Sequence, residues 1–158
     1  MAGNTISEIE GLDELMKKLR DVADEEQYRE AIEKACRSVE YAAKQKAPRL
    51  TGALKASITH EIAEENGEIV GYVGTNIEYA PYQEFGTGKF AENGNGRKTP
   101  WAYIDERTGD TIWTAGNKPQ PFLRPALRDR QERIRQIFVR AVNQATGTRK
   151  KNGGVSAQ

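Results

Sequence analysis

The sequence predicts an α+β fold, in which an antiparallel β-sheet of hairpins packs against two long helices in a single domain. Three observations lead to this prediction. The two ends of the chain carry helical periodicity, the middle carries strand-like alternation, and 158 residues suffice for one hydrophobic core but not comfortably for two. Because the strand patterns cluster instead of alternating with helices, antiparallel pairing is expected rather than βαβ units.

Two helices are expected before residue 50. The first is short and amphipathic, with leucines at helical spacing: Leu12, Leu15 and Leu19. The second begins near Glu25 and has a face of alanine and larger apolar residues opposite a charged face. Pro48 ends it, because proline disfavours helical geometry in the residue before it.

A β-hairpin is expected next. Thr51 and Gly52 supply a turn, and a strand follows over residues 57–64. The Asn-Gly pair at 66–67 favours the positive φ angles of a tight hairpin turn, after which residues 68–75 return as a second strand. Alternation places two residues of each strand on one face, Ile58 with Ile62 and Ile69 with Val73.

The segment 88–100 is expected to be a mobile loop. It is rich in glycine, and its apolar side chains are those of Phe90 and Ala91. Ordering about 15 residues costs on the order of 15 kcal/mol of backbone entropy, which needs roughly 600 Å² of apolar burial to offset. Those two side chains cannot supply that burial within a monomer.

Residues 101–114 are expected to form a projecting β-hairpin, since WAYIDE and TIWT flank the turn sequence RTGD. A final helix is expected from about Pro125 to Ala145, with Gly147 as its cap. The single domain then covers residues 1–147, and residues 148–158 are expected to be a disordered tail.

Composition narrows the chemistry. Cys36 is the only cysteine, which excludes an intrachain disulfide and a cysteine-based zinc site. His60 is the only histidine and has no nucleophile motif near it, and the acids are scattered along helix faces, so neither catalysis nor a metal site is expected. No apolar stretch approaches a membrane span and the start lacks a signal-peptide layout, so folding in the cytosol is expected.

Charge is distributed unevenly along the chain. The formal net charge is +1, but the residues from Pro119 onward carry +7 and the remainder −6. Such polarity favours head-to-tail contact between copies, or contact with a polyanion. The arginine-rich last helix leaves an alternative hypothesis, that the chain is a DNA-binding accessory protein. No DNA-reading motif accompanies this helix. The stretch FGTGKF lacks the full spacing of a phosphate-binding loop.

Three stretches in a fixed order carry a family resemblance: APRLTGALKASI (47–58), YAPYQEFGTGK (79–89) and QPFLRPAL (120–127). Together with the opening GLDEL, they resemble the tail-completion, neck or head-tail joining proteins of tailed phages and prophages. The resemblance extends to about Ala145. The segment WAYIDERTGDTIWTAG resembles an insertion that only some members carry.

This resemblance implies a structural virion protein with no catalytic activity and no cofactor. Such proteins assemble as a ring, often sixfold, between the head connector and the tail tube. The implied partners are further copies of the chain, a head-completion or connector protein, and the tail tube or tail terminator protein. DNA would pass through the lumen without sequence specificity, and Arg128 and Arg135 are the candidates to line that channel or a subunit contact. The implied location is the virion, after assembly in the host cytoplasm.

The resemblance also assigns candidate motif and interface residues: Pro48, Thr51, Gly52, Tyr79, Glu84, Phe85, Gly86, Thr87, Pro121, Phe122 and Pro125. The first three would fix the turn from helix to hairpin, the next five would shape the junction before the loop, and the last three would anchor the final helix. Each could equally hold the fold, and Phe122 has the character of a core residue. Glu84 is a candidate to pair with an arginine, such as one from a neighbouring subunit's basic helix.

Overall fold

The computed structural model of the chain describes residues 9–49 and 52–152, with side chains up to residue 147. It confirms the α+β class, with two antiparallel hairpins and two long helices. In chain order the elements are α1 (Leu12–Val22), α2 (Glu25–Lys46), α3 (Ala53–Ser57), β1 (Thr59–Glu65), β2 (Glu68–Gly74), α4 (Ala80–Phe85), the 3-10 turn η1 (Gly88–Phe90), β3 (Trp101–Ile104), β4 (Thr111–Thr114) and α5 (Leu123–Asn152).

Local signals set the limits of α2. The side chain of Asp24 accepts the backbone N–H of Gln27, while the side chain of Gln27 accepts the N–H of Asp24, which completes a capping box. The other end closes with the N–H of Ala47 donated to the carbonyl of Ala43, and Pro48 follows immediately. The helix therefore ends where the proline predicts.

The last helix differs from the prediction at both ends. It begins at Leu123, two residues before Pro125, and it continues through Gly147 to Asn152. Pro125 is tolerated because the first turn of a helix has no internal use for its missing N–H. The expectation that Gly147 caps the helix is wrong, and the helix occupies the first part of the segment expected to be a disordered tail. Residues 153–158 lie outside the described chain.

The first hairpin has the expected turn but a later start. Residue Ser57 belongs to α3, so the strand expected from 57 begins at Thr59 instead. In the paired register Ile62 lies opposite Gly71. A side chain at Gly71 would collide with the sulfur of Cys36 in α2, which shows that this face of the hairpin packs on that helix. Ile69 and Val73 share the face and also pack on the core.

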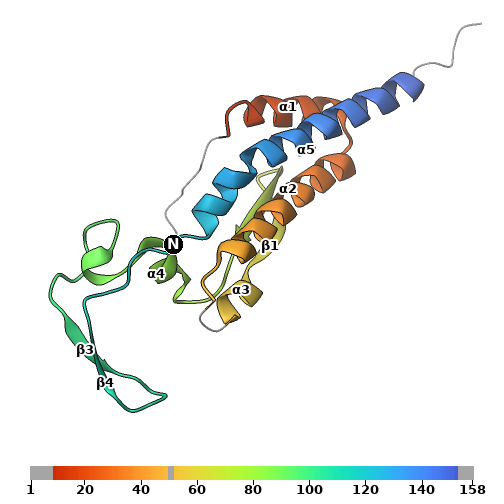
Figure 1. The fold of residues 1–158 in the computed structure, drawn as a ribbon. Coiled ribbons are helices and arrows are strands. Elements are labelled where there is room, and N and C mark those ends of the chain that lie inside the picture. Colours follow the sequence, from red (N-terminus) through yellow and green to blue (C-terminus); the bar gives the residue numbers. More distant parts are fainter. Residues whose placement is uncertain (1–8, 50–51, 153–158) are drawn as a thin grey trace, which may run out of the picture.

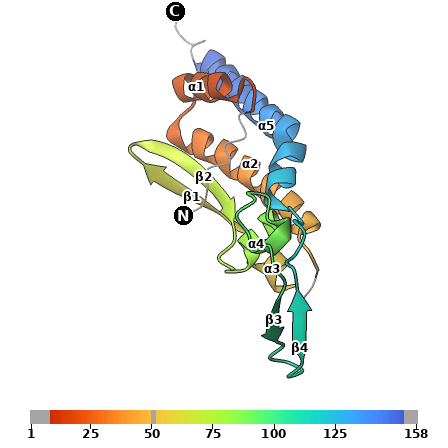
Figure 2. The same cartoon turned by 90° about the vertical axis from the view of Figure 1, so that its left-hand side faces the viewer.

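The elements form a layered body with one projection. Figure 1 shows α5 between α1 and α2, and Figure 2 shows the hairpin of β1 and β2 on the far side of α2 from α5. The buried core lies mostly between α2 and α5, with Phe122, Leu19 and Ile58 completely enclosed. Among the described residues, no helix is long and apolar enough to cross a membrane.

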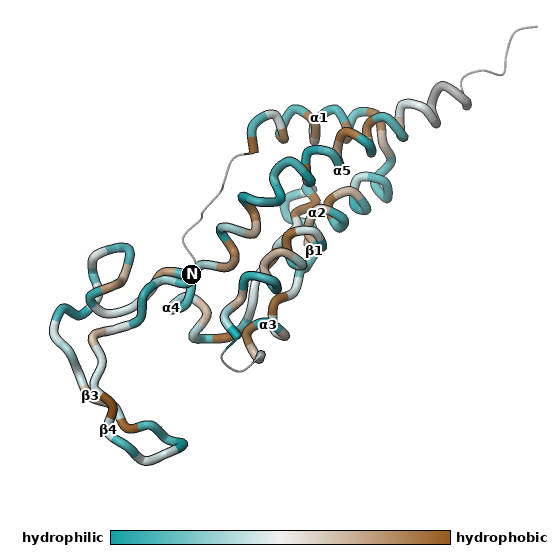
Figure 3. The backbone as a smooth tube through the Cα atoms, viewed as in Figure 1, coloured by the Kyte–Doolittle hydropathy of each residue, from teal (hydrophilic) through white to brown (hydrophobic). Residues whose placement is uncertain are grey.

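Strands β3 and β4 form a second, separate sheet, which we call the arm (residues 101–114). It extends away from the helical body in both views, and its strands pair chiefly with each other (Figures 1 and 2). Figure 3 shows strongly apolar segments on this projection, far from the core. The predicted sheet of hairpins is therefore two independent two-stranded sheets, of which only one covers a helix.

Candidate assembly interface

Glu84 closes the start of α5. Its carboxylate accepts the backbone N–H groups of Phe122 at 2.7 Å, Leu123 at 3.0 Å and Arg124 at 3.0 Å. A helix leaves its first four N–H groups without partners inside the helix, and the fourth position here is Pro125, which has none. One carboxylate therefore satisfies the donors at this end, and its negative charge suits the positive end of the helix dipole.

Arg124 donates side-chain hydrogen bonds to the same glutamate. Its Nε donates to Glu84 at 2.9 Å and its Nη2 donates to the backbone carbonyl of Glu84 at 2.8 Å. Its two terminal nitrogens also donate to both carboxylate oxygens of Glu92, at 2.9 and 3.0 Å. The guanidinium lies 4.6 Å from the centre of the Phe85 ring. The Arg124 side chain thus joins the end of α4 and Glu92 to the start of α5, which is more than 30 positions later in the sequence.

The environment keeps Glu84 ionised. The residue is only 3% exposed, and burial by itself would raise the pKa of its carboxyl group. The backbone N–H groups of Phe122 and Leu123, with the guanidinium of Arg124, outweigh that effect and hold the pKa below its ordinary value. Hydrogen bonds from Arg124 also lower the pKa of Glu92. We call this cluster of Glu84, Glu92 and Arg124 the lock.

A backbone clamp follows the lock and forms the base of the arm. The N–H of Thr87 donates to the carbonyl of Asn117 at 2.9 Å, and the N–H of Asn117 donates to Oγ1 of Thr87 at 2.9 Å. The N–H of Lys89 donates to the carbonyl of Ala115 at 2.9 Å. We call these two adjacent segments, residues 86–89 and 115–117, the neck.

Gly88 permits this close approach. Its φ is +58°, and a Cβ there would lie 2.2 Å from the carbonyl oxygen of Ala115. The sequence predicts that a mobile loop begins at this glycine. Instead it brings two backbones together, and η1 with the hydrogen bond from Glu92 N–H to the carbonyl of Phe85 continues the ordered path. Mobility of residues 88–100 remains a prediction.

The arm exposes apolar side chains on both of its faces. The register pairs Ala102 with Trp113 and Tyr103 with Ile112, so these pairs point to opposite sides of the ribbon. Trp113 is 72% exposed and Ile104 67% exposed, and both lie on one face. The turn that joins the strands adds three acids and one arginine: Asp105, Glu106, Asp110 and Arg107.

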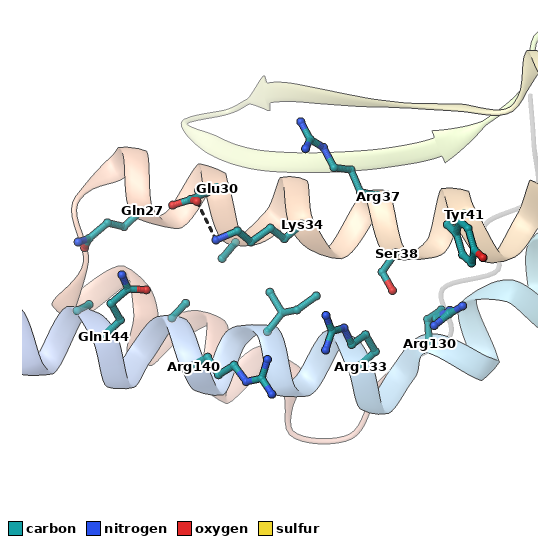
Figure 4. Close-up of a pocket in the computed structure, with 14 residues that line it drawn as sticks. Gln27, Glu30, Lys34, Arg37, Ser38, Tyr41, Arg130, Arg133, Arg140 and Gln144 are labelled. Carbon is teal, nitrogen blue, oxygen red and sulfur yellow. Dashed lines mark ion pairs between the residues drawn. The ribbon is translucent and has the colours of Figure 1, made fainter.

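An open groove of about 770 Å³ runs between α2 and α5 (Figure 4). Its wall from α5 carries three arginines and its wall from α2 carries two further cations: Arg130, Arg133, Arg140, Lys34 and Arg37. Glu30 is the only acid among its lining residues and is paired with Lys34. Alanines and Ile137 form the apolar part of the lining. The groove is therefore basic, with an apolar component.

The two basic residues that the sequence analysis named, Arg128 and Arg135, lie outside the groove. Arg128 and Arg135 are both exposed and seven residues apart, so they share one face of α5. At 100° per residue this face is opposite the one that lines the groove. Arg135 instead lies beside the start of α1, with its Nη2 3.4 Å from where a side chain on Gly11 would begin. The sequence reasoning named arginines on the outer face and missed the pair at the groove, Arg133 and Arg140.

Most of the other candidate residues have local structural positions. Gly52 precedes α3 and its carbonyl accepts the N–H of Ala56, while Tyr79 precedes α4 and its carbonyl accepts the N–H of Tyr82. Gly86 is buried and follows α4, and Pro121 is exposed beside the lock. Thr51 lies outside the described residues. The structure brings the second and third motifs together at the lock. The first motif lies at the same end of the body, because Lys46 at the end of α2 pairs with Asp129 near the start of α5, and Figure 2 shows α3 beside α4.

His60 takes part in a separate polar cluster. Its Nδ1 contacts Glu40, which also pairs with Lys44. Burial by itself would raise the pKa of Glu40. The hydrogen bonds from His60 and Lys44 outweigh burial, so the pKa lies below its ordinary value. Over the described part of the chain, no group of three or more His, Cys, Asp or Glu side chains could hold a metal ion.

Residues 11–86 match the family model described as "Bacteriophage HK97-gp10, putative tail-component". The resemblance to a phage morphogenesis family is confirmed. The HK97-gp10-like part spans α1 to α4 and ends at Gly86, just under half of the 158 residues, so the arm and α5 lie beyond it. The matched description is of a tail component of a bacteriophage, which supports a structural role in the virion. No curated protein and no solved structure gave a significant match.

Proposed function

We propose that this chain is a tail-completion or neck protein that forms a ring at the junction between the phage head and tail. The proposal also includes the absence of catalytic activity. The observation that carries it is the arm, which exposes Trp113 and Ile104 to solvent at a distance from the core. An isolated two-stranded hairpin is marginally stable in water, so an apolar one is best explained by a protein partner that covers it.

A ring fits the asymmetric surfaces of the molecule. The arm and the groove are different patches, and a contact between unlike patches closes into a ring when the rotation between subunits permits. The charge difference between the N-terminal part and the C-terminal part supports head-to-tail contact in the same way. The proposed ring is sixfold, as rings in the family that the sequence resembles often are.

The proposed partners are the proteins on either side of the ring. A head-completion or connector protein lies on one side, and the tail tube or tail terminator protein on the other. DNA passes through the lumen without sequence specificity, and Arg128 and Arg135 are the cations proposed to face it or a neighbouring subunit. The chain is made in the host cytoplasm and remains in the virion.

The test is to assemble phage particles without this chain. Complete heads and complete but unjoined tails should accumulate, and electron microscopy of the lysate would show them separately. Supplying the chain in trans should restore joined particles. Normal infectious particles formed without the chain would contradict the proposal. Tight, salt-sensitive binding of monomeric chain to duplex DNA would instead favour the DNA-binding accessory protein.

A further inference from the structure

We propose that the arm of one copy docks into the groove between α2 and α5 of the next copy. This inference rests on the proposed ring and deepens it, because it assigns the two surfaces that meet. The occupant is a second copy of the chain, since the arm extends away from its own helices and its own groove (Figure 1).

The first support is charge complementarity. The turn of the arm carries three carboxylates and one arginine. The groove is lined by five cations and one carboxylate, and two of these cations, Lys34 and Arg37, pair with Glu30 and Glu33 of α2. Within the described residues, Arg133 and Arg140 form no ion pair, and Figure 4 shows them on the wall that α5 contributes. Opposite charges on two unlike patches steer them together and disfavour other pairings.

The second support is apolar complementarity. Trp113 and Ile104 lie diagonally across one face of the arm, beside the acidic turn, and both are exposed. The groove offers Ile137 and alanines of both helices, together with the exposed ring of Tyr41, over which Arg130 lies at 5.7 Å. A buried aromatic anchor with a charged rim is the usual arrangement of a protein interface.

The third support is size. The groove follows α2 from Gln27 to Tyr41, a length of about 21 Å at 1.5 Å per residue. The paired strands of the arm have four residues each, or about 13 Å, and the turn extends them further. The arm is therefore of a length that the groove can accommodate. Each subunit gives one arm and receives one, so a modest contact is repeated around a closed ring.

The hydrogen bonds at the base of the arm make such docking specific. The neck holds both ends of the arm segment by backbone hydrogen bonds, and the lock ties the neck to the first turn of α5. The arm is therefore presented in a set direction relative to the groove of the same subunit. A set direction between donor and acceptor surfaces is what fixes the rotation from one subunit to the next.

Two variants of the full chain test the docking in solution. The arm variant is Ile104→Ser with Trp113→Ser, and the groove variant is Arg133→Glu with Arg140→Glu. All four side chains are exposed, so folding should be retained. The matched control is Lys17→Glu with Lys55→Glu, the same charge change at exposed cations of α1 and α3 that lie outside the groove. Sedimentation velocity and electron microscopy give the assembly state.

The expected result is that each docking variant associates at least tenfold more weakly than the control, which assembles like the unaltered chain. An equimolar mixture of the two docking variants should form dimers and no rings, because it retains one good arm and one good groove. Normal rings from either variant would overturn the docking while leaving the ring proposal intact. A groove variant that assembles normally but loses duplex DNA binding would assign the groove to DNA and also overturn it.

Cross-linking in particles covers the case in which copies associate only on the virion. Thr108→Cys lies in the turn of the arm and Ser38→Cys lies in the groove. A short bismaleimide should link neighbouring copies into a ladder when both substitutions are present, and not when either is alone. Particles that contain the protein but give no ladder would overturn the docking. Joined particles that lack the protein would overturn the proposed function itself.

Discussion

The carboxylate of Glu84 and the guanidinium of Arg124, 2.9 Å apart, join two sequence motifs that are separated by the whole arm. Glu84 belongs to YAPYQEFGTGK and Arg124 to QPFLRPAL. The pair lies within one chain, so the expectation that Glu84 could pair with a neighbouring subunit is replaced by an internal contact. The two motifs are halves of one structure.

Replacing Glu84 with glutamine should destabilise the protein by about 3 kcal/mol, as expected when one partner of a buried ionic hydrogen-bond network is lost. The amide nitrogen of glutamine cannot accept a hydrogen bond, so the backbone N–H groups that it faces would lose their acceptor. Urea unfolding followed by circular dichroism would measure the change in unfolding free energy. The matched control is Glu92→Gln, which removes the more exposed carboxylate partner of the same arginine and should destabilise the protein much less. Equal losses in the two variants would contradict the role assigned to Glu84.

Acid should remove the contribution of Glu84. Its pKa is lower in the folded protein than the ordinary value of 4.5, so its stabilisation is complete above that value and is lost as the pH falls through the folded pKa. The difference in unfolding free energy between the unaltered chain and Glu84→Gln should be constant from neutral pH to about pH 5 and then shrink. A difference that grew on acidification would reverse the sign and refute the assignment.

Gly88→Ala should open the neck. The added Cβ would approach the carbonyl oxygen of Ala115 to 2.2 Å, so the two backbone segments must separate. Gly94→Ala is the control, because Gly94 also has a positive φ, of +70°, but nothing lies within 4 Å. Amide hydrogen exchange at Thr87 and Lys89 should accelerate at least tenfold in the first variant only. Unchanged exchange would show that the neck accommodates a side chain.

Hydrogen exchange should also divide the loop of residues 88–100. The amides of Lys89 and Glu92 donate to carbonyls in other segments and should be protected in the free protein. Residues 96–99 donate no backbone N–H bond within the described structure, so their amides should exchange almost without protection. Uniform protection across the segment in a monomer would contradict the entropy argument that predicts mobility.

DNA contact, where it occurs, should involve the outer face of α5. Arg128→Gln with Arg135→Gln should lower the magnitude of the salt dependence of duplex DNA binding by about two, as expected for two lost phosphate contacts. Arg133→Gln with Arg140→Gln has the same charge change and should leave the slope as it is. The reverse pattern would move the DNA surface to the groove.

The sequence predicts the parts of the fold that depend on local periodicity. The long helices and the first hairpin follow from repeated spacing, from Pro48 and from the Asn-Gly turn, and the structure confirms them. The short helices α3 and α4 escape such reasoning, because five or six residues do not complete two helical turns. The cap signal at Gly147 fails because one glycine does not overcome continued helical pairing on both sides.

The lock could not be predicted from spacing, because its members are distant in sequence. Glu84 and Phe122 are separated by 38 positions, and only the folded neck brings them together. A signal was nevertheless present in the third motif: Arg124 lies between Phe122 and Pro125, at the predicted start of a helix whose N–H groups need an acceptor. The basic groove could not be predicted from the sequence for a similar reason, because its lining depends on which face of α5 packs against α2.

The chain leaves the body at Thr87 and returns at Asn117, and these two residues are hydrogen-bonded to each other. The exit and the return are adjacent, so the residues between them, apart from Glu92 of the lock, constitute a cassette that could be shortened, lengthened or exchanged without moving the core. This geometry would allow an insertion of the kind that the sequence resemblance implies to be added or removed on a common scaffold. Partner choice can therefore change through the cassette alone, while the ends of the scaffold stay fixed.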